Sequence, residues 1–476
     1  MLFNSLHFAL FFPIVTIAFF LLSGRARWAL LLVASAYFYM ALVPAYIVIL
    51  LLLIAIDFAA GIKIDESEGA KRKLWLWLSL TANLSILFFF KYLWFALEQV
   101  SWLSGRLGAH WALPALKLAL PVGLSFHTFQ SLAYTIDVYR RTERAERNFA
   151  VYALYVLFYP QLVAGPIERP RRLLPQLHEL PSVEFDATRA SSGLRLMLWG
   201  LLKKVAVADG LAALVNRTYA DVGHADSAAL LMAAYAFSVQ IYCDFSGYTD
   251  IARGAARVMG VELMQNFDRP YAARSFGEFW HRWHISLSTW FRDYLYIPLG
   301  GSRAGLARNI RNLLVVFVVS GLWHGANWTF AVWGALHGCF LIGELLLKRA
   351  LRGRAFSGGF WSVVRWGLVF HGVTLAWVFF RARNLAEAVL YLTRLVSGVG
   401  LRSSHGHNLG SPLQLLFVFG VAGLVLGLES LNKRLDLWPR LERAPVAPRW
   451  LAYYAGVLLL LSSLGSSPQQ FIYFQF

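Results

Sequence analysis

Charged side chains are scarce in this chain of 476 residues. Lysine, arginine, aspartate and glutamate together make up 15% of it, whereas hydrophobic residues make up 58%. This balance excludes an ordinary soluble globular protein and indicates a polytopic membrane protein. The charges that are present are mostly basic, with 44 lysines and arginines against 26 acids. They stand in short clusters between apolar runs, so positive-inside anchoring in a membrane explains them without a nucleic-acid partner.

Cysteine is equally sparse. The chain has only Cys243 and Cys339, both in apolar surroundings, which excludes a disulfide framework and a Cys-x-x-Cys metal motif. We interpret both as buried, inert thiols. The first apolar run also lacks the basic start and small-residue cleavage site of a signal peptide, so we expect it to be retained as a membrane span.

Apolar runs long enough to cross a bilayer core of about 30 Å recur along the chain. We expect spans near residues 7–23, 28–43, 45–60, 74–96, 114–138, 191–215, 227–246, 311–330, 331–347, 359–380, 413–430 and 449–464. With an amphipathic interfacial helix at 384–397 and a re-entrant segment, they predict an all-α membrane protein of roughly ten to twelve crossings. We expect one membrane domain over 1–476, with N-terminal helices at 1–138, a core with the catalytic motifs at 139–347 and C-terminal helices at 348–476.

The segment 148–190 does not fit a simple alternation of spans and loops. Its apolar run lies between two basic stretches, 139–147 and 167–180, which cannot both be cytoplasmic if the run crosses completely. Pro160 and Gly165-Pro166 supply the helix breakers that a re-entrant hairpin needs. Because irregular backbone at membrane depth must be buried in protein or line a water-filled cavity, this segment predicts an interior chamber.

Other polar groups within the apolar runs are open to more than one interpretation. Lys203 and Lys204 can snorkel if they lie near an interface. Arg303, Arg308 and Arg311 lie between two apolar segments, where they could attract an anionic nucleotide or act only as positive-inside anchors. One half of the chain shows no clear repeat in the other, which weighs against a transporter.

His324 is the first candidate for a functional residue. An ionisable side chain in a membrane is costly unless it faces protein or water, and His324 ends a strongly apolar run between Gly321 and Gly325. A neutral imidazole can act as general base toward a hydroxyl. Asn327, which we expect on the same face three residues later, can donate to an oxyanion. The alternative is a structural histidine packed among tryptophans, among them Trp323.

His281 and His284 lie three residues apart in a helix predicted over 275–296, with Ser288 one turn beyond His284. They could form half of a metal site, but no cysteine is close and the nearby carboxylates lack ligand spacing, so we expect no metal. The alternative is an amphipathic helix along the membrane surface with interfacial histidines. His337, in the next apolar run, is interpreted as structural.

Long motifs around these histidines resemble a known family. WHRWHISLSTWFRDYLYIPLGGSR at 280–303 and GLWHGANWTFAVWGALHG at 321–338 resemble the membrane-bound O-acyltransferase superfamily, in its bacterial polysaccharide branch typified by alginate O-acetyltransferases. Further stretches resemble the same branch: MLFNS at the start, SFHTFQSLAYTIDVYR, FYPQLVAGPIERP, DFSGYTDIARGAARVMG and the terminal FIYFQF. The resemblance therefore covers nearly the whole chain.

The resemblance implies a catalytic pair. The principal histidine of the family, in Trp-His-Gly, matches His324, and the second, in Arg-Trp-His, matches His284, whereas His281 matches no required histidine. Trp323, Asn327 and Ser288 are expected to support substrate binding or the transition state. The family fold is a multi-helix body whose centre is thinned by funnels that meet near the Trp-His-Gly histidine.

The resemblance also implies the reaction. An acetyl group passes from cytoplasmic acetyl-CoA across the bacterial inner membrane to a secreted polysaccharide, commonly through a periplasmic partner protein, and no cofactor stays bound. Three alternatives remain open: D-alanyl transfer to teichoic acid, a transporter or flippase with proton-relay histidines, and a scaffold that recruits other acetylation enzymes.

Overall fold

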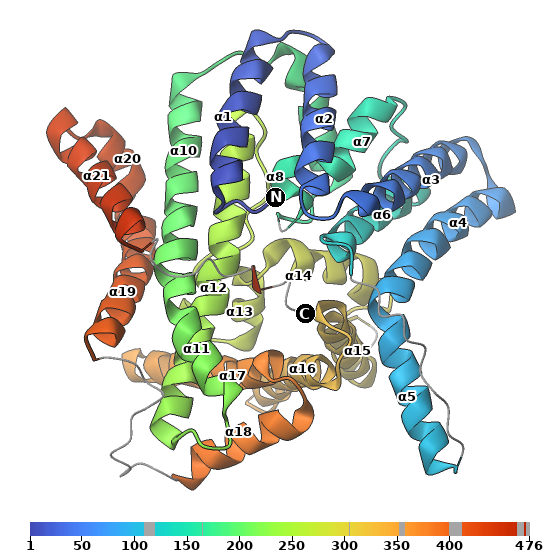
Figure 1. Ribbon diagram of the computed structural model, residues 1–476. Helices are drawn as coiled ribbons and strands as arrows, with labels where there is room; N and C mark the ends of the chain where they lie inside the picture. The colour runs from blue at the N-terminus through green and yellow to red at the C-terminus, as the bar shows by residue number, and fades with distance from the viewer. Residues whose placement is uncertain are drawn as a thin grey trace. The chain divides into compact units, whose positions relative to one another are not determined.

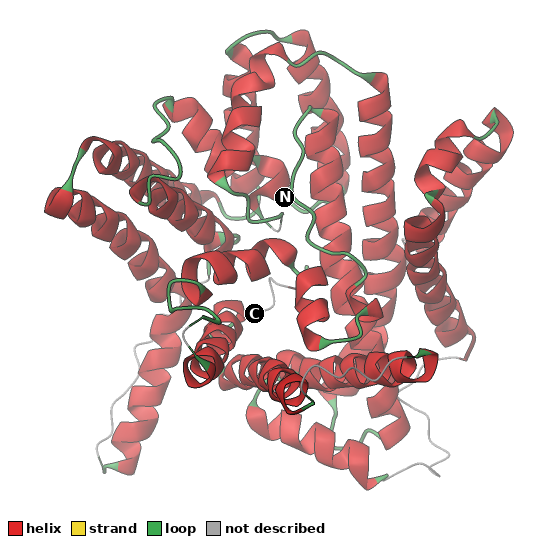
Figure 2. Ribbon diagram, turned by 180° about the vertical axis from the view of Figure 1, so that it is seen from behind, coloured by secondary structure: helices red, strands yellow, loops and turns green. Residues whose placement is uncertain are grey.

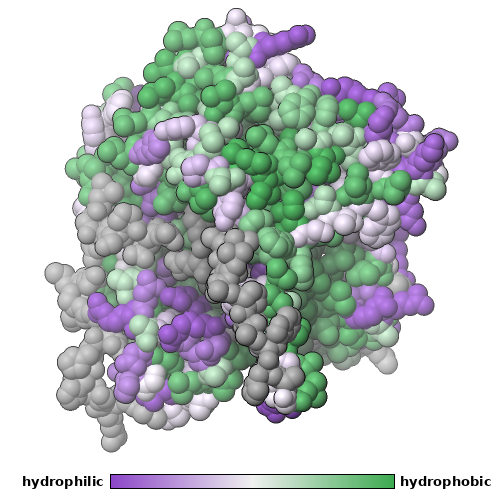
Figure 3. All heavy atoms as spheres, turned by 45° about the vertical axis from the view of Figure 1, so that its right-hand side comes forward, coloured by the Kyte–Doolittle hydropathy of each residue, from purple (hydrophilic) through white to green (hydrophobic). Residues whose placement is uncertain are grey.

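The computed structural model describes the chain except for residues 109–119, 164, 304, 352–357, 399–411, 464–470 and 473–476. Over the described residues the secondary structure is helical, without a strand (Figure 2). This confirms the prediction of an all-α protein. The face drawn in Figure 3 is largely hydrophobic, and many large apolar side chains are exposed on the helices, as expected where helices meet lipid.

Six described helical segments are long and apolar enough to cross a membrane. They are Pro44–Glu66, Gly69–Arg106, Ser227–Val258, Leu306–His324, Trp328–Ala350 and Gly359–Arg381. Leu6–Leu21 and Ala26–Met40 are apolar but shorter. The ten to twelve crossings and the division of the domain at 138 and 347 stay predictions. The span expected at 114–138 begins outside the described residues.

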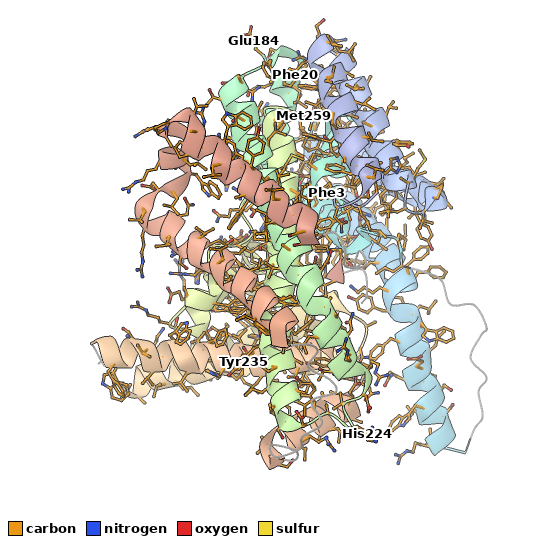
Figure 4. The ribbon with its side chains drawn as sticks, turned by 60° about the vertical axis from the view of Figure 1, so that its left-hand side comes forward. Phe3, Phe20, Glu184, His224, Tyr235 and Met259 are labelled. Carbon is orange, nitrogen blue, oxygen red and sulfur yellow. The ribbon has the colours of Figure 1, made fainter. Side chains whose placement is uncertain are left out.

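The chain folds into two compact units, Met1–Met197 with Ile251–Gln265, and Leu198–Asp250 with Asn266–Phe476. Two helices contribute residues to both units: α10 (Ala187–Leu201) and α12 (Ser227–Val258). Figure 4 shows α12 running from near His224 to Met259.

The first unit contains most of the N-terminal helices. They are α1 (Leu6–Leu21), α2 (Ala26–Met40), α3 (Ile47–Glu66), α4 (Gly69–Leu87), α5 (Leu93–Arg106), α6 (Leu124–Tyr139), α7 (Phe149–Leu157), α8 (Tyr159–Leu162) and α9 (Pro170–Glu179). A buried polar clamp joins α3 to α4: the Asp57 carboxylate accepts hydrogen bonds from the Ser79 hydroxyl at 2.6 Å and the Asn83 amide at 2.9 Å. Such pairing is what allows a carboxyl group to be buried between apolar helices.

The segment expected to be re-entrant is broken into short helices. α7 has 9 residues and α8 has 4, far fewer than the roughly 20 that a full crossing needs. The break falls at Phe158, and Pro160 lies in the first turn of α8, where proline is tolerated. The interruption is therefore confirmed, while the path of this segment relative to the membrane stays a prediction.

The second unit holds the remaining helices (Figure 1). They are α11 (Gly210–Ala220), α13 (Phe276–Arg282), α14 (Ile285–Phe291), α15 (Leu306–His324), α16 (Trp328–Ala350), α17 (Gly359–Arg381), α18 (Leu385–Ser397), α19 (Pro412–Leu435), α20 (Leu437–Arg443) and α21 (Val446–Ser463). Helix α18 confirms the helix expected at 384–397. Cys243 is buried as expected, but Cys339 is exposed on α16, so the interpretation of that thiol as buried is wrong.

Helices α15 and α16 form a hairpin in which backbone meets backbone. A Cβ atom added at Gly321 would lie 2.1 Å from the carbonyl oxygen of Phe330, and one added at Gly334 would lie 2.1 Å from that of Phe317. Only glycine permits this approach. The hairpin fixes the position of His324, the last residue of α15.

Candidate active site

The structure brings the two predicted catalytic histidines together. The ring centroids of His284 and His324 lie 6.4 Å apart, and the residues are 1% and 5% exposed. Both belong to the second unit, although they come from different helix ends: His324 closes α15, and His284 precedes α14. The site is therefore assembled by tertiary packing.

His284 lies in a turn. Its backbone adopts the left-handed conformation, with φ 41° and ψ 55°, and Trp283 before it is extended. The continuous helix predicted over 275–296 is therefore wrong, and His281 does not share a helical face with His284. The exposed His281 ring instead donates a hydrogen bond to the Gly277 carbonyl at 2.6 Å. A left-handed non-glycine residue is uncommon and persists where its surroundings impose it.

A loop before α13 imposes this turn. The backbone N–H of Asp268 donates to the carbonyl of Arg282 at 3.0 Å, and that of Ile285 donates to the carbonyl of Asn266 at 2.9 Å. The Asn266 side-chain oxygen accepts a further bond from the backbone N–H of Ser286 at 3.2 Å. The turn that carries His284 is thus held on both sides by one loop.

The two imidazoles lie in an aromatic enclosure. Phe245 on α12 meets the His284 ring edge-on at 4.6 Å between centroids. Trp323, Trp333 and Phe380 surround His324 with centroids at 5.0, 5.1 and 5.3 Å. His284 lies outside the six candidate spans, and its burial lowers the pKa of the imidazole to about 3. That ring is neutral at pH 7, because removal from water disfavours the charged form.

Asn327 is placed differently from the expectation. Helix α15 ends at His324, so Asn327 does not lie on a helical face with it; that part of the prediction is wrong. Asn327 is the N-cap of α16, where its side-chain oxygen accepts from the N–H of Thr329 at 3.1 Å and its amide group donates to the carbonyl of Arg383 at 2.9 Å. Both ends of this amide are engaged in holding the turn after His324.

A pocket of about 340 Å³ adjoins the same elements. Its walls are mostly apolar and come from α13 to α16 and the π-helical turn Arg292–Tyr296. Ser288 lines it, with its hydroxyl donating to the Trp283 carbonyl at 3.1 Å. Ile285, which follows His284, and Ser320, one turn before His324, also line the pocket. The pocket therefore borders both histidine-bearing segments.

His337 packs behind the pair. It is fully buried, and its ring contacts Trp280 and Trp333 with centroids at 5.0 Å from each. Neither ring nitrogen has a hydrogen-bond partner among the residues that the structure describes. The packing supports the interpretation of His337 as structural.

Buried ion pairs flank the site on α12, and sequence reasoning missed them. Lys204 pairs with Asp209 and Asp244, each at 2.8 Å, and Lys203 pairs with Asp250 and with Glu429. Both lysines are about 2% exposed or less, so the expectation that they snorkel to an interface is wrong. Their acidic partners come from distant helices, which neutralises the charge inside the protein.

The chain near its C-terminal end reaches the same region. The backbone N–H of Ile472 donates to the Asp244 carboxylate at 2.7 Å. The ring of Phe471 packs on Tyr248 at 4.5 Å and on Phe245 at 5.7 Å between centroids. Because Phe245 also contacts His284, this end of the chain is part of the packing that supports the site.

Comparison with known proteins adds a consistent set of relatives. The model of the membrane-bound O-acyltransferase family matches residues 139–385. The chain is 37% identical over 396 residues to a probable alginate O-acetylase of Pseudomonas syringae pv. tomato, covering 82% of this chain and 74% of the relative. It is 35% identical over 443 residues to a peptidoglycan O-acetyltransferase of Helicobacter pylori, covering 85% and 81%. A teichoic acid D-alanyltransferase of Streptococcus thermophilus is 27% identical over 232 residues, covering 46% and 56%.

Proposed function

On the premise that this chain belongs to the membrane-bound O-acyltransferase family and is a multi-pass membrane O-acyltransferase, we propose that it transfers acetyl groups from acetyl-CoA to a secreted polysaccharide. The relatives that match over most of their length are named for acetylation of alginate and peptidoglycan. The family excludes the transporter and scaffold alternatives. D-alanyl transfer is less favoured, because that relative matches less than half of this chain.

The observation that carries this proposal is the juxtaposition of His324 and His284 in a buried, aromatic enclosure. In the proposed mechanism His324 removes the proton from an acceptor hydroxyl, and the hydroxyl oxygen forms a bond to the acyl carbon. The bond between that carbon and the thioester sulfur then breaks, and the proton returns to the departing thiolate. His284, which is neutral at pH 7, orients the reacting groups.

The pocket bordered by Ser288 and Ser320 provides a place for the acyl donor beside these histidines. Trp323 forms a wall that excludes water from His324, and Asn327 holds the turn that follows it. Exclusion of water protects the thioester from hydrolysis and strengthens the polar contacts made inside the site. No permanently bound cofactor has a role in this mechanism.

The remaining parts of the proposal rest on the resemblance of the motifs. The enzyme would lie in the bacterial inner membrane and take acetyl-CoA from the cytoplasm through one funnel. It would deliver the acetyl group on the other side, with a periplasmic partner protein completing the transfer. A neutral acetyl group can pass where the charged nucleotide cannot, which is the physical reason for transferring only the group.

The test is acetyl transfer by the purified protein in liposomes with labelled acetyl-CoA and a polysaccharide acceptor. The parent should release free thiol and label the acceptor, whereas His324→Ala should abolish both while inserting normally. His371→Ala is the matched control, because His371 is exposed on α17 and bonds only its own helix, at the Gly367 carbonyl. Retained transfer by His324→Ala would refute the mechanism. Transfer from a D-alanyl carrier thioester but not from acetyl-CoA would favour the alternative.

A further inference from the structure

Asn266 combines full burial with an incomplete set of hydrogen bonds. It is 0% exposed, and its side chain lies at the peptide that follows His284. Its side-chain oxygen accepts from the N–H of Ser286, and because a backbone N–H can only donate, the other atom of that amide must be the NH₂ group. This group, Nδ2, has no hydrogen-bond partner among the described residues.

A buried donor without a partner is unusual in a folded protein. Most buried polar groups are bonded, since leaving one unpaired costs free energy that folding must offset. Asn266 cannot turn to relieve this, because its backbone carbonyl is bonded to Ile285 while its side-chain oxygen is bonded to Ser286. The amide is therefore fixed in place with one donor unused, beside a histidine whose backbone is itself left-handed. Such features cluster where a site is organised in advance for a ligand.

We infer that Asn266 is a further catalytic residue, whose Nδ2 donates a hydrogen bond to the carbonyl oxygen of the acyl group during transfer. This inference rests on the proposed function. When the acceptor oxygen bonds to the acyl carbon, the electron pair of the C=O bond moves onto the carbonyl oxygen, which becomes negative. That pair returns when the C–S bond breaks and the thiolate leaves with the proton held by His324. A donor fixed beforehand stabilises the negative oxygen without reorganising.

The geometry favours Asn266 over Asn327 for this role. The Asn327 amide already donates to the Arg383 carbonyl and its oxygen accepts from Thr329. Asn266 has the same side chain with its donor unused. Of these two amides, only Asn266 can bond a substrate without first breaking a bond within the protein.

The competing explanation is that Asn266 only holds the turn that carries His284. Asn266→Asp separates the two explanations, because aspartate keeps the oxygen that accepts from Ser286 but lacks the NH₂ group. Asn266→Ala removes both functions. Asn384→Asp is the matched control: Asn384 is exposed, caps α18 by accepting from the N–H of Glu387 at 2.9 Å, and lies outside the site.

The full-length protein in liposomes is assayed for kcat and for KM toward acetyl-CoA. We expect Asn266→Asp to lower kcat by about 10²–10³-fold, as for loss of one oxyanion donor, with KM changed less than about threefold. Asn266→Ala should lose at least as much, and Asn384→Asp should keep the parental kcat. Parental kcat in Asn266→Asp, with or without a loss in Asn266→Ala, would overturn the inference.

Two further outcomes are covered by design. If Asn266→Asp does not accumulate in membranes, Asn266→Ser replaces it, since serine is neutral and has no amide; the same loss of kcat is expected, and parental kcat would overturn the inference. If the parent itself shows no thiol release above His324→Ala, it is the proposed acetyl transfer that fails. The failure of the two proposals is therefore distinguishable.

Discussion

The carboxylate of Asp244 accepts the backbone N–H of Ile472 across 228 residues of sequence, at 2.7 Å. The same carboxylate pairs with Lys204 at 2.8 Å. Phe245, the next residue, contacts both Phe471 and His284. One buried ion pair thus connects the C-terminal end of the described chain to the surroundings of the candidate catalytic pair.

The Lys204 pair leads to a first prediction. Lys204→Met would leave Asp209 and Asp244 buried without their cation, and we expect the free energy of unfolding to fall by about 3–5 kcal/mol. Thermal unfolding in detergent measures this. Lys348→Met is the control, because its pair with Glu344 is exposed to solvent and should change stability by less than about 1 kcal/mol. Equal effects from the two substitutions would contradict the prediction.

A second prediction concerns the helical hairpin. Gly321→Ala places a methyl group 2.1 Å from the Phe330 carbonyl oxygen, so α15 and α16 must separate. We expect a loss of about 1–3 kcal/mol, as for overpacking, with reduced acyl transfer because His324 moves. Gly343→Ala on α16 has nothing within 4 Å and should leave stability unchanged or raise it by up to about 1 kcal/mol. Unfolding midpoints and transfer rates of both variants provide the check.

A third prediction uses the backbone of His284. Glycine accepts a left-handed conformation without cost, whereas alanine there costs about 1–2 kcal/mol. His284→Gly should therefore unfold at a higher temperature than His284→Ala, while both show the same loss of acyl transfer. If alanine proved the more stable replacement, the left-handed turn would not exist in solution.

The fourth prediction is a dependence of stability on pH. Burial lowers the pKa of His284 to about 3, against about 6.5 for an unfolded histidine. Between these values the unfolded chain binds a proton that the folded chain does not, so stability falls as the pH falls below about 6.5. His284→Asn removes this proton. We expect the parent to lose up to about 1.4 kcal/mol more than His284→Asn per pH unit in that window, measured as unfolding midpoints at pH 7.5 and 5.5.

The parts of the fold that sequence analysis predicted are those set by local pattern. The apolar runs that became α15, α16 and α17 were long enough to stand out, and α18 followed from its amphipathic period. The boundary between the expected spans 311–330 and 331–347 was displaced, because Asn327 caps α16 and the chain turns at Gly325. Caps shift helix ends without changing the hydropathy on which spans are predicted.

The parts that were missed depend on residues distant in sequence. The spacing of His281 and His284 suggested one helical face, but the loop at Asn266 and Asp268 pairs with the residues around His284 and forces a turn there. Lys203 and Lys204 suggested snorkelling until their partners on α12 and α19 came into view. The histidines themselves were found from motif and chemistry, while the groups that orient them were visible only in three dimensions.

The contact between α15 and α16 has a mechanical consequence. Backbones that touch at Gly321 and Gly334 leave no side chain between them that could rotate to let the helices slide. His324 therefore rides on a stiff rod, and the two histidines can change their spacing only if the short helices α13 and α14 tilt. Any gate that admits and releases substrate has its moving part on the His284 side, and its fixed post on the His324 side.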